Sequence, residues 1–334
     1  MIWLWVGFLL FVLAMLALDL GVFHRRAHEI RVKEALAWTG VWVGLALAFA
    51  VFVFFLYQHR LWGVIDPKAP GGREAALLFL TGYVVEKSLS ADNIFVIAII
   101  FSYFGVKLKY QHRVLFWGVL GAIALRAAMI MGGLALVHRF AWVLYIFGAF
   151  LIYSALKMLL STSEADPGRN LFVRLARRLL PVTEEMSGPR FLVRQGGRRM
   201  LTPLALVLVA VEGADVVFAV DSIPAIFAIT QIDFIVFTSN IFAILGLRSM
   251  FFALSAVLRK FRYLKVSLAV LLGVIGLKML LKDLIEDLPG KTYLTLGLIV
   301  AILGAGIVAS VLRPMSAAEG PTGADAEEKD AGDR

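Results

Sequence analysis

The sequence predicts an all-α polytopic membrane protein with nine transmembrane helices, in which two units of three helices form an inverted repeat. Three observations support this fold class. Hydrophobic residues make up 60% of the 334 residues, whereas a soluble domain is roughly 45–50% apolar. Nine apolar stretches are each long enough to cross a bilayer, which takes about 20 residues. Finally, short sequence matches recur in the same order at a nearly constant offset.

The nine predicted spans are separated by loops that carry charges, proline or glycine. They comprise residues 2–23, 35–57, 75–104, 114–137, 141–160, 203–230, 234–258, a span that ends near 282, and 292–312. The longest loop, 161–201, is basic, and its segment 171–180 has apolar and basic residues at helical spacing, which favours a short interfacial helix. Residues 314–334 are small and acidic, so we expect a disordered tail after a membrane domain of residues 1–313.

The charges of the loops predict the orientation. Loops after the first, third, fifth and seventh spans are strongly basic, and the others are short, mixed or acidic. Because basic loops stay in the cytoplasm, the N-terminus is expected outside and the C-terminus in the cytoplasm. This distribution explains the net charge of +9 without nucleic acid. The first span lacks a preceding basic segment and is expected to remain uncleaved.

Three short matches indicate the repeat. They pair 91–96 with 214–219, 125–126 with 247–248, and 156–160 with 277–281. The offsets, from 91 to 214, 125 to 247 and 156 to 277, are 123, 122 and 121 residues. Each unit contains three spans, an odd number, so the second unit is inverted relative to the first. Secondary transporters often have this architecture, with the substrate site at the interface of the repeats.

The most unusual stretch is 211–224, V-E-G-A-D-V-V-F-A-V-D-S-I-P, because one apolar span contains three carboxylates. They are Glu212, Asp215 and Asp221. A charge at membrane depth is costly and indicates a functional site by default. Pro224 cannot donate to the carbonyl of Val220. We therefore expect a broken or kinked helix whose freed carbonyl could bind a cation. The alternative is a kinked helix whose acids only balance basic residues.

Acidic residues outnumber basic ones inside the predicted spans. The six acids are Asp19, Glu86, Asp92, Glu212, Asp215 and Asp221. Apart from Lys87, the deep basic residues are Arg126 and Arg248, at equivalent positions of the repeat. We expect both arginines to face the interior and to pair with acids of the third and sixth spans. The excess carboxylates must then be protonated or neutralised by a bound cation.

The repeat makes Asp92 and Asp215 pseudo-symmetric partners and predicts a metal site between the third and sixth spans. Its expected ligands are Glu86, Asp92, Asn93, Glu212, Asp215 and Asp221, with gating or supporting roles for Asp19, Ser90, Arg126 and Arg248. All the donors are oxygens, which suit Mg²⁺, Mn²⁺ or Ca²⁺ better than Zn²⁺ or Cu⁺. Because carboxylates lose protons when they bind metal, exchange of cations for protons is expected.

Two motifs resemble signatures of the TerC family, E-K-S-L-S-A-D-N at Glu86–Asn93 and F-A-V-D-S-I-P-A at Phe218–Ala225. The resemblance extends to L-D-L-G-V-F-H-R at Leu18–Arg25 and covers most of 1–313. It implies a bacterial inner-membrane protein that exports metal ions, chiefly Mn²⁺, from a family linked to tellurium resistance and placed in the lysine-exporter superfamily. The acidic motifs of the family map onto five residues and onto the first-span acid, namely Glu86, Asp92, Glu212, Asp215, Asp221 and Asp19.

Two other functions remain open. The protein could export another cationic solute, such as a basic amino acid, whose ammonium group carboxylates would also bind. It could instead be a non-transporting membrane anchor of a metal or tellurite stress-response complex. The absence of cysteine excludes disulfides, thiolate metal sites and thiol catalysis. No catalytic triad, nucleotide loop or redox motif is present, so we expect neither enzymatic activity nor a resident cofactor. The expected partners are the transported ion and membrane lipids.

Overall fold

The structure is a computed structural model that describes residues 2–23, 32–60, 69–160, 171–179, 181–183, 188–195, 198–254, 263–285 and 290–312. Its helices are α1 (Ile2–Phe23), α2 (Val32–Gln58), α3 (Gly72–Tyr103), α4 (Leu108–Arg139), α5 (Val143–Leu160), α6 (Leu171–Leu179), α7 (Pro203–Phe227), α8 (Asp233–Ile244), α9 (Leu247–Leu254), α10 (Leu264–Leu280), α11 (Lys282–Ile285) and α12 (Lys291–Leu312). Its strands are β1 (Leu192–Gln195) and β2 (Arg198–Leu201).

Helices of membrane-spanning length dominate the described chain. Five of them, α2, α4, α5, α7 and α12, are long and apolar enough to cross a membrane, and the bent pair α8–α9 is a sixth if it counts as one span. These helices agree with an all-α polytopic membrane protein. The helix α3 has 32 residues but contains Glu86, Lys87 and Asp92, and α10 has only 17 residues. The count of nine spans therefore stays a prediction.

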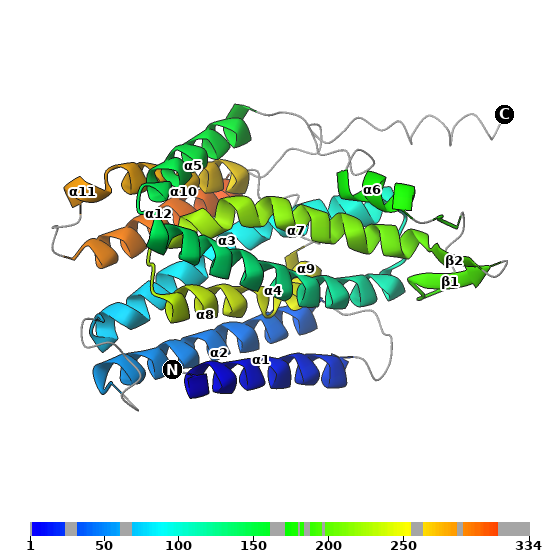
Figure 1. Cartoon of the computed structure of the whole chain (residues 1–334), viewed down its shortest axis with the longest axis horizontal. Coiled ribbons are helices and arrows are strands. Elements are labelled where there is room, and N and C mark those ends of the chain that lie inside the picture. The colour runs from blue at the N-terminus through cyan, green and yellow to red at the C-terminus, as the bar shows by residue number, and fades with distance from the viewer. Residues whose placement is uncertain are drawn as a thin grey trace.

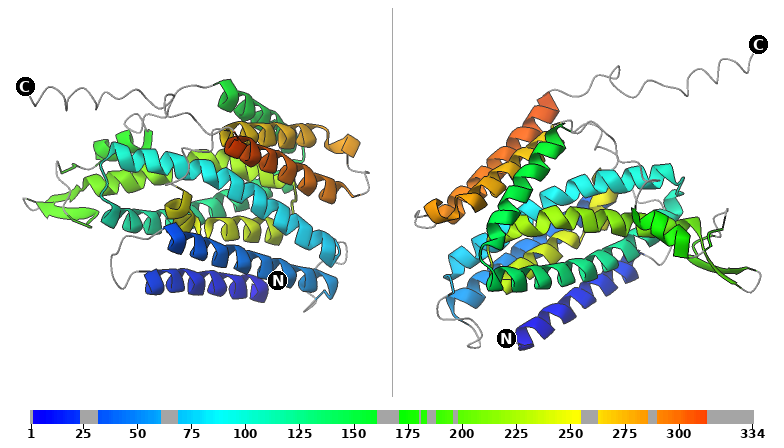
Figure 2. Two further views of the ribbon diagram at one scale, coloured as in Figure 1. Left: turned by 180° about the vertical axis from the view of Figure 1, so that it is seen from behind. Right: turned by 45° about the horizontal axis from the view of Figure 1, so that its top comes forward.

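The helices form three layers (Figures 1 and 2). One outer layer contains α1 and α2, the middle layer contains α3, α4, α7, α8 and α9, and the opposite outer layer contains α5, α10 and α12. In the middle layer, α3 packs against α7 and α8, and α4 packs against α7. The predicted chemistry of the chain lies mostly on these middle helices.

Aromatic side chains join the first layer to the middle one. Phe49 of α2 lies at their centre, with ring centroids 5.7 Å from Phe8 of α1, 5.3 Å from Phe79 of α3 and 4.6 Å from Phe242 of α8. Aromatic pairs at such separations stabilise a core beyond the apolar area that they bury. This cluster fixes α3 and α8 against α2 and thereby positions one side of the polar centre.

In the other outer layer, α5 and α10 contact each other through glycines. A Cβ atom added at Gly276 of α10 would lie 2.8 Å from the carbonyl oxygen of Gly148 of α5, and one added at Gly148 would lie 3.0 Å from the carbonyl oxygen of Gly276. The two backbones therefore approach too closely for any side chain. Membrane helices commonly associate through such small residues, because close packing replaces the hydrophobic driving force.

The predicted break in the span with three acids is wrong. The helix α7 runs without interruption from Pro203 to Phe227 and includes Pro224. Proline lies there within four residues of the end of the helix, where one lost hydrogen bond is tolerated. The break lies in the next span instead, where α8 and α9 meet at an angle of 43°. Gly246, with φ +81°, occupies this junction in the left-handed conformation that favours glycine.

The basic loop contains more structure than the sequence led us to expect. The predicted short helix is present as α6, close to the predicted bounds, and its interfacial position stays a prediction. The hairpin of β1 and β2 is an addition, in which Leu192 pairs with Leu201 and Gln195 with Arg198 in antiparallel register. Its signal was Gly196-Gly197 between the two strand segments, a sequence typical of tight hairpin turns. The acidic tail, 314–334, lies outside the described residues.

Candidate functional site

The candidate site begins with the placement of α7. Thr202 caps this helix, since its side-chain oxygen accepts a hydrogen bond from the backbone N–H of Ala205 at 3.3 Å, and Pro203 occupies the first turn. Both are preferred helix-start residues. The hydroxyl of Thr202 also donates to the carbonyl of Arg190 at 2.6 Å, which ties the start of the helix to the hairpin segment. From this fixed start, α7 carries its three acids through the middle layer.

Arg126 of α4 forms the centre of the site. Its guanidinium donates to Glu86 of α3, to Asp215 of α7 at 2.9 Å and 3.3 Å, and to the hydroxyl of Ser222 at 3.3 Å. The amide of Asn240 of α8 donates to the second oxygen of Glu86 at 3.1 Å. Arg126 thus joins α4 to α3 and α7, and Glu86 extends the network to α8. This is the pairing with acids of the third and sixth spans that the sequence led us to expect for Arg126.

The charges of this cluster do not balance. Glu86 and Asp215 carry two negative charges when both are ionised, whereas Arg126 carries one positive charge. The side chains are 2% exposed for Glu86, 12% for Asp215 and 1% for Arg126. Burial of an ion pair is tolerated only when hydrogen bonds and charges compensate for lost water. With both carboxylates ionised, the cluster therefore carries one uncompensated negative charge, which a proton or a cation would neutralise.

Glu212 extends this acidic region along α7. Among the described residues, its Oε2 atom is buried without a hydrogen-bond partner. Its carboxylate lies against α4 at Gly121, where an added Cβ would come within 2.0 Å of Oε1. Only a residue without a side chain leaves room for the carboxylate at this position. Glu212 is otherwise half-buried, but a buried carboxylate oxygen without a hydrogen-bond partner is costly, so Glu212 is a second place for a proton or a cation.

A cavity of about 480 Å³ lies beside the cluster, between α3, α5, α7 and α10. Two carboxylates line it, Asp92 of α3 and Asp221 of α7. The hydroxyl of Ser154 of α5 donates to Asp221 at 2.7 Å. Lys157 and Lys265 also line the cavity, near the end of the bundle where α5 ends and α10 begins. The cavity is large enough for a hydrated ion and offers carboxylate, hydroxyl and amide oxygens.

Two residues connect the cavity to the arginine cluster. Ser222 lines the cavity and accepts the hydrogen bond from Arg126. Asn93 lines both the cavity and a much smaller space of about 20 Å³ beside Asp215. A space of this size holds about one water molecule. Polar groups thus continue from the cavity to the buried cluster.

Five of the six predicted ligands form two neighbouring groups, and the sixth, Glu212, lies outside both. Glu86 and Asp215 meet at Arg126, whereas Asp92, Asn93 and Asp221 line the cavity, and Glu212 lies at α4. Among the described residues, no three His, Cys, Asp or Glu side chains come close enough together to hold a metal ion. A single shell of all six ligands therefore stays a prediction.

The predicted gating and supporting residues lie as follows. Ser90 is buried on α3, and Arg248 is buried on α9. The side chain of Asp19 lies outside the described part of the chain.

The sequence did not indicate that Asn240 and Ser154 form hydrogen bonds with the acids of the site, nor what Lys87 binds. The ammonium group of Lys87 donates to the carbonyls of Ala243 at 3.1 Å and Leu245 at 3.5 Å, at the C-terminal end of α8. A cation is favoured there because unpaired carbonyls and the helix dipole are negative. Asn240 and Ser154 were visible only as polar residues in apolar spans. Lys87 thus stabilises the break between α8 and α9.

Residues 71–317 match the family described as "Integral membrane protein TerC family". A membrane protein of Myxococcus xanthus without an assigned function is 49% identical over 323 residues, 95% of this chain and 96% of its own. Alx of Escherichia coli, named as a candidate membrane-bound redox modulator, is 49% identical over 283 residues, 84% of this chain and 86% of its own. No solved structure matches the chain.

Proposed function

Because the chain belongs to the TerC family of integral membrane proteins, we propose that it exports a divalent metal cation, with Mn²⁺ as the first candidate, in exchange for protons. The observation that carries the proposal is the charge imbalance around Arg126, which holds two buried carboxylates with one positive charge. Ionisable residues within membrane helices usually mark the paths of ions or protons. The oxygen donors of the site suit a hard divalent cation.

The transport path that we propose uses the two neighbouring groups in turn. The cation meets Asp92 and Asp221 in the cavity, where water and protein oxygens can both coordinate it. From there it competes with Arg126 for Asp215, past Ser222. In the absence of the cation, Arg126 keeps the buried carboxylates compensated. Competition between an internal arginine and the substrate ion allows the site to be emptied as well as filled.

Protons are the proposed counter-ions. Carboxylates bind metal only when ionised, so metal binding and proton release are linked. Glu212 supports this coupling, because its Oε2 atom has no hydrogen-bond partner in the described chain. A protonated carboxyl group is less costly to bury than a bare carboxylate. We propose that Glu212 takes up a proton when the cation leaves and releases it when the cation returns.

The architecture that we propose for this transport is the inverted repeat of α3–α5 and α7–α10. In support, α3 packs against α8 and α4 packs against α7, which are equivalent pairs if the two units exchange. Added Cβ atoms at Gly273 and Gly276 would contact Ala155 and Ile152, respectively. With the offset of 121 residues, Gly273 is equivalent to Ile152 and Gly276 is equivalent to Ala155, so exchange of the two units turns each contact into the other. Rocking of one repeat against the other is a common transport motion.

We also propose that this repeat lies in a bacterial inner membrane with the N-terminus outside, as the loop charges predict. In that orientation the loops that follow α5 and precede α10 are cytoplasmic. The cavity with Asp92 and Asp221 approaches this end of the bundle at Lys157 and Lys265. Access from the cytoplasm is what an exporter requires.

The name of the Alx relatives suggests a second description, modulation of cellular redox state. The present chain contains no cysteine, so it has no thiol of its own for thiol–disulfide exchange. Export of a redox-active metal would change the redox state without any thiol in the transporter. The two descriptions are therefore compatible, and metal transport is the more direct one to measure.

The decisive experiment compares ions in inside-out membrane vesicles that contain the full chain. We expect accumulation of Mn²⁺ above that of vesicles without the protein, with Mg²⁺, Ca²⁺ and Zn²⁺ as competitors. Protons should leave the vesicle lumen as Mn²⁺ enters, which a pH-sensitive dye detects. Accumulation of lysine without Mn²⁺ would favour the export of a cationic solute. Absence of transport of any of these ions would favour the membrane anchor.

A further inference from the structure

A second cavity, of about 310 Å³, lies at the end of the bundle where α7 leads to α8 and α10 leads to α12. It shares no lining residue with the cavity of Asp92 and Asp221. Three lysines from three helices line it, Lys278 of α10, Lys282 of α11 and Lys291 of α12. The one acidic residue among its described lining is the exposed Glu74. The described part of the lining is therefore positive.

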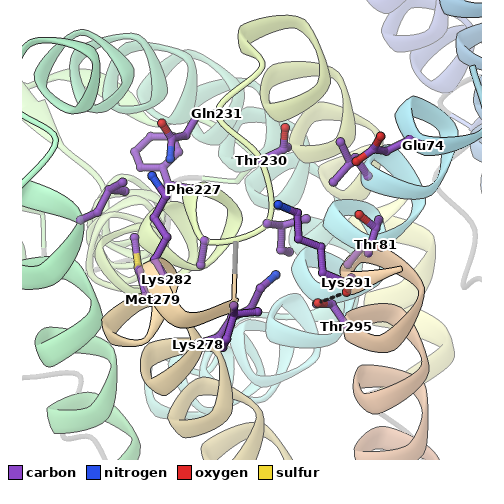
Figure 3. A pocket seen from close by; sticks show the side chains of 16 residues that line it. Glu74, Thr81, Phe227, Thr230, Gln231, Lys278, Met279, Lys282, Lys291 and Thr295 are labelled. Atoms are coloured by element: carbon purple, nitrogen blue, oxygen red, sulfur yellow. Dashed lines mark hydrogen bonds between the residues drawn. The ribbon is translucent and has the colours of Figure 1, made fainter. Parts of the chain in front are cut away.

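The lysine side chains point into the cavity from different directions (Figure 3). In the described part of the chain, no carboxylate lies within ion-pair distance of Lys278 or Lys282. Lys278, Lys282 and Lys291 all line this one cavity, so their positive charges face a common space. Like charges that converge on one space repel each other, and an anion between them would relieve the repulsion. This convergence indicates that the cavity is suited to a negatively charged ligand.

Neutral donors add to the positive lining. The hydroxyl oxygen of Thr230 accepts a hydrogen bond from the N–H of Ile232 at 3.2 Å, which leaves its own O–H to donate. Thr230 is buried and lies on the connection between α7 and α8, as labelled in Figure 3. The start of α12 also lines the cavity with Lys291, Thr292 and Thr295, although the hydroxyl of Thr295 already donates to the carbonyl of Lys291 at 2.7 Å. The N-terminus of a long helix carries a partial positive charge that attracts anions.

We propose that this cavity binds an oxyanion of the phosphate type. A compact oxyanion can accept charge-assisted hydrogen bonds from several ammonium groups at once, and lysine is a common phosphate ligand. The cavity is roomy for one phosphate group and its bound water. Two sources present the same chemistry, inorganic phosphate in water and the phosphate of an anionic phospholipid. The site does not depend on metal transport, since its residues take no part in the transport path.

The test is thermal unfolding of the purified full chain in detergent at constant ionic strength. Inorganic phosphate, phosphatidylglycerol and phosphatidylcholine are added separately, with chloride as the salt control. We expect the Tm to rise by about 2–4 °C with phosphate or with phosphatidylglycerol, because a ligand that binds only the folded state stabilises it. A rise with phosphate identifies the free anion, and a rise with phosphatidylglycerol alone identifies the lipid.

The matched variants are Lys278→Gln combined with Lys282→Gln, and Lys107→Gln as an exposed control before α4. The double variant should lose the rise in Tm, and the control should keep it. If the double variant does not fold, Lys282→Gln alone, on the short helix α11, should reduce the rise by at least half. The proposal is overturned if neither inorganic phosphate nor phosphatidylglycerol raises the Tm. It is also overturned if chloride or phosphatidylcholine raises the Tm equally, or if the rise is unchanged in the lysine variants.

Discussion

Replacement of Asp215 by Asn tests the candidate site most directly, because it removes a charge and keeps the volume. Asp215 accepts two hydrogen bonds from Arg126, at 2.9 Å from Nη2 and 3.3 Å from Nε. In Asp215→Asn one oxygen remains and can still accept one of them. Arg126 also keeps its bonds to Glu86 and Ser222. The change therefore weakens one connection of the cluster and leaves the others in place.

The stability loss follows from these contacts. Removal of one partner from a buried pair costs about 3–5 kcal/mol when it strands a charge, whereas a hydrogen bond to a charged group is worth about 1.5–3 kcal/mol. Because Arg126 retains Glu86 as a counter-charge, we expect a loss in the lower range, about 1–3 kcal/mol. Export should fall much further, at least about 100-fold, which corresponds to about 2.7 kcal/mol in the barrier. The reason is that the variant lacks the carboxylate for which the cation and Arg126 compete in the proposed path.

The assay measures Mn²⁺ uptake into inside-out vesicles and the abundance of the protein in the same vesicles. Asp233→Asn is the matched control, since Asp233 starts α8, is 59% exposed and lies 3.7 Å from His138. This variant should transport at the wild-type rate. Asp215→Asn at normal abundance with wild-type export would refute the site. A loss of export that only follows a loss of abundance would show that Asp215 merely balances Arg126.

Three further substitutions separate stability from transport. Arg126→Gln strands two buried carboxylates and should destabilise the protein by about 3–5 kcal/mol, measured as a lower Tm and lower abundance. Gly121→Ala should lower Mn²⁺ export with little change in Tm, because the new Cβ displaces the flexible carboxylate of Glu212. Gly276→Ala should lower the Tm, with a loss of about 1–3 kcal/mol, because its Cβ meets the rigid backbone of Gly148.

Two neighbouring glycines provide the controls for these changes. Gly118 lies one turn before Gly121 on α4. A Cβ added there would lie 3.3 Å from a methyl group of Val211, whereas one added at Gly121 would lie 2.0 Å from Oε1 of Glu212. Gly118→Ala should keep export. Gly297 has nothing within 4 Å of an added Cβ, so Gly297→Ala should keep the Tm. Equal effects in test and control variants would contradict the assigned contacts.

Long helices and buried ion pairing were predictable because each rests on one strong physical requirement. Apolar stretches such as 203–230 must be helical in a membrane, where every backbone group needs an internal partner. A lone arginine in an apolar helix, such as Arg126, must find a carboxylate. The sequence therefore limited the partners of Arg126 to the acids of the third and sixth spans, without identifying them individually. It also placed α6, because apolar and basic residues alternate there at helical spacing.

The break between α8 and α9 was not predictable from local signals. Pro224 is the stronger helix breaker in isolation, yet it lies where α7 ends, so little is lost. Gly246 follows the end of α8 with a positive φ, and Trp42 of α2 leaves no room for a side chain there, since its Cγ lies 2.6 Å from an added Cβ. Lys87 of α3 then donates to the carbonyls of Ala243 and Leu245 at the end of α8. Both contacts come from helices distant in sequence, and no local pattern contains them.

The connections of Arg126 differ in which part of the fold they join. Its bond to Glu86 links α4 to α3, within the first predicted unit, whereas its bonds to Asp215 link α4 to α7, in the second. A cation that competes for Asp215 therefore weakens the connection between the units and leaves the first unit intact. In the proposed transport cycle, selective weakening of this kind would couple occupancy of the site to relative motion of the two proposed repeats. For this reason the charge of Asp215 should matter more for export than for folding.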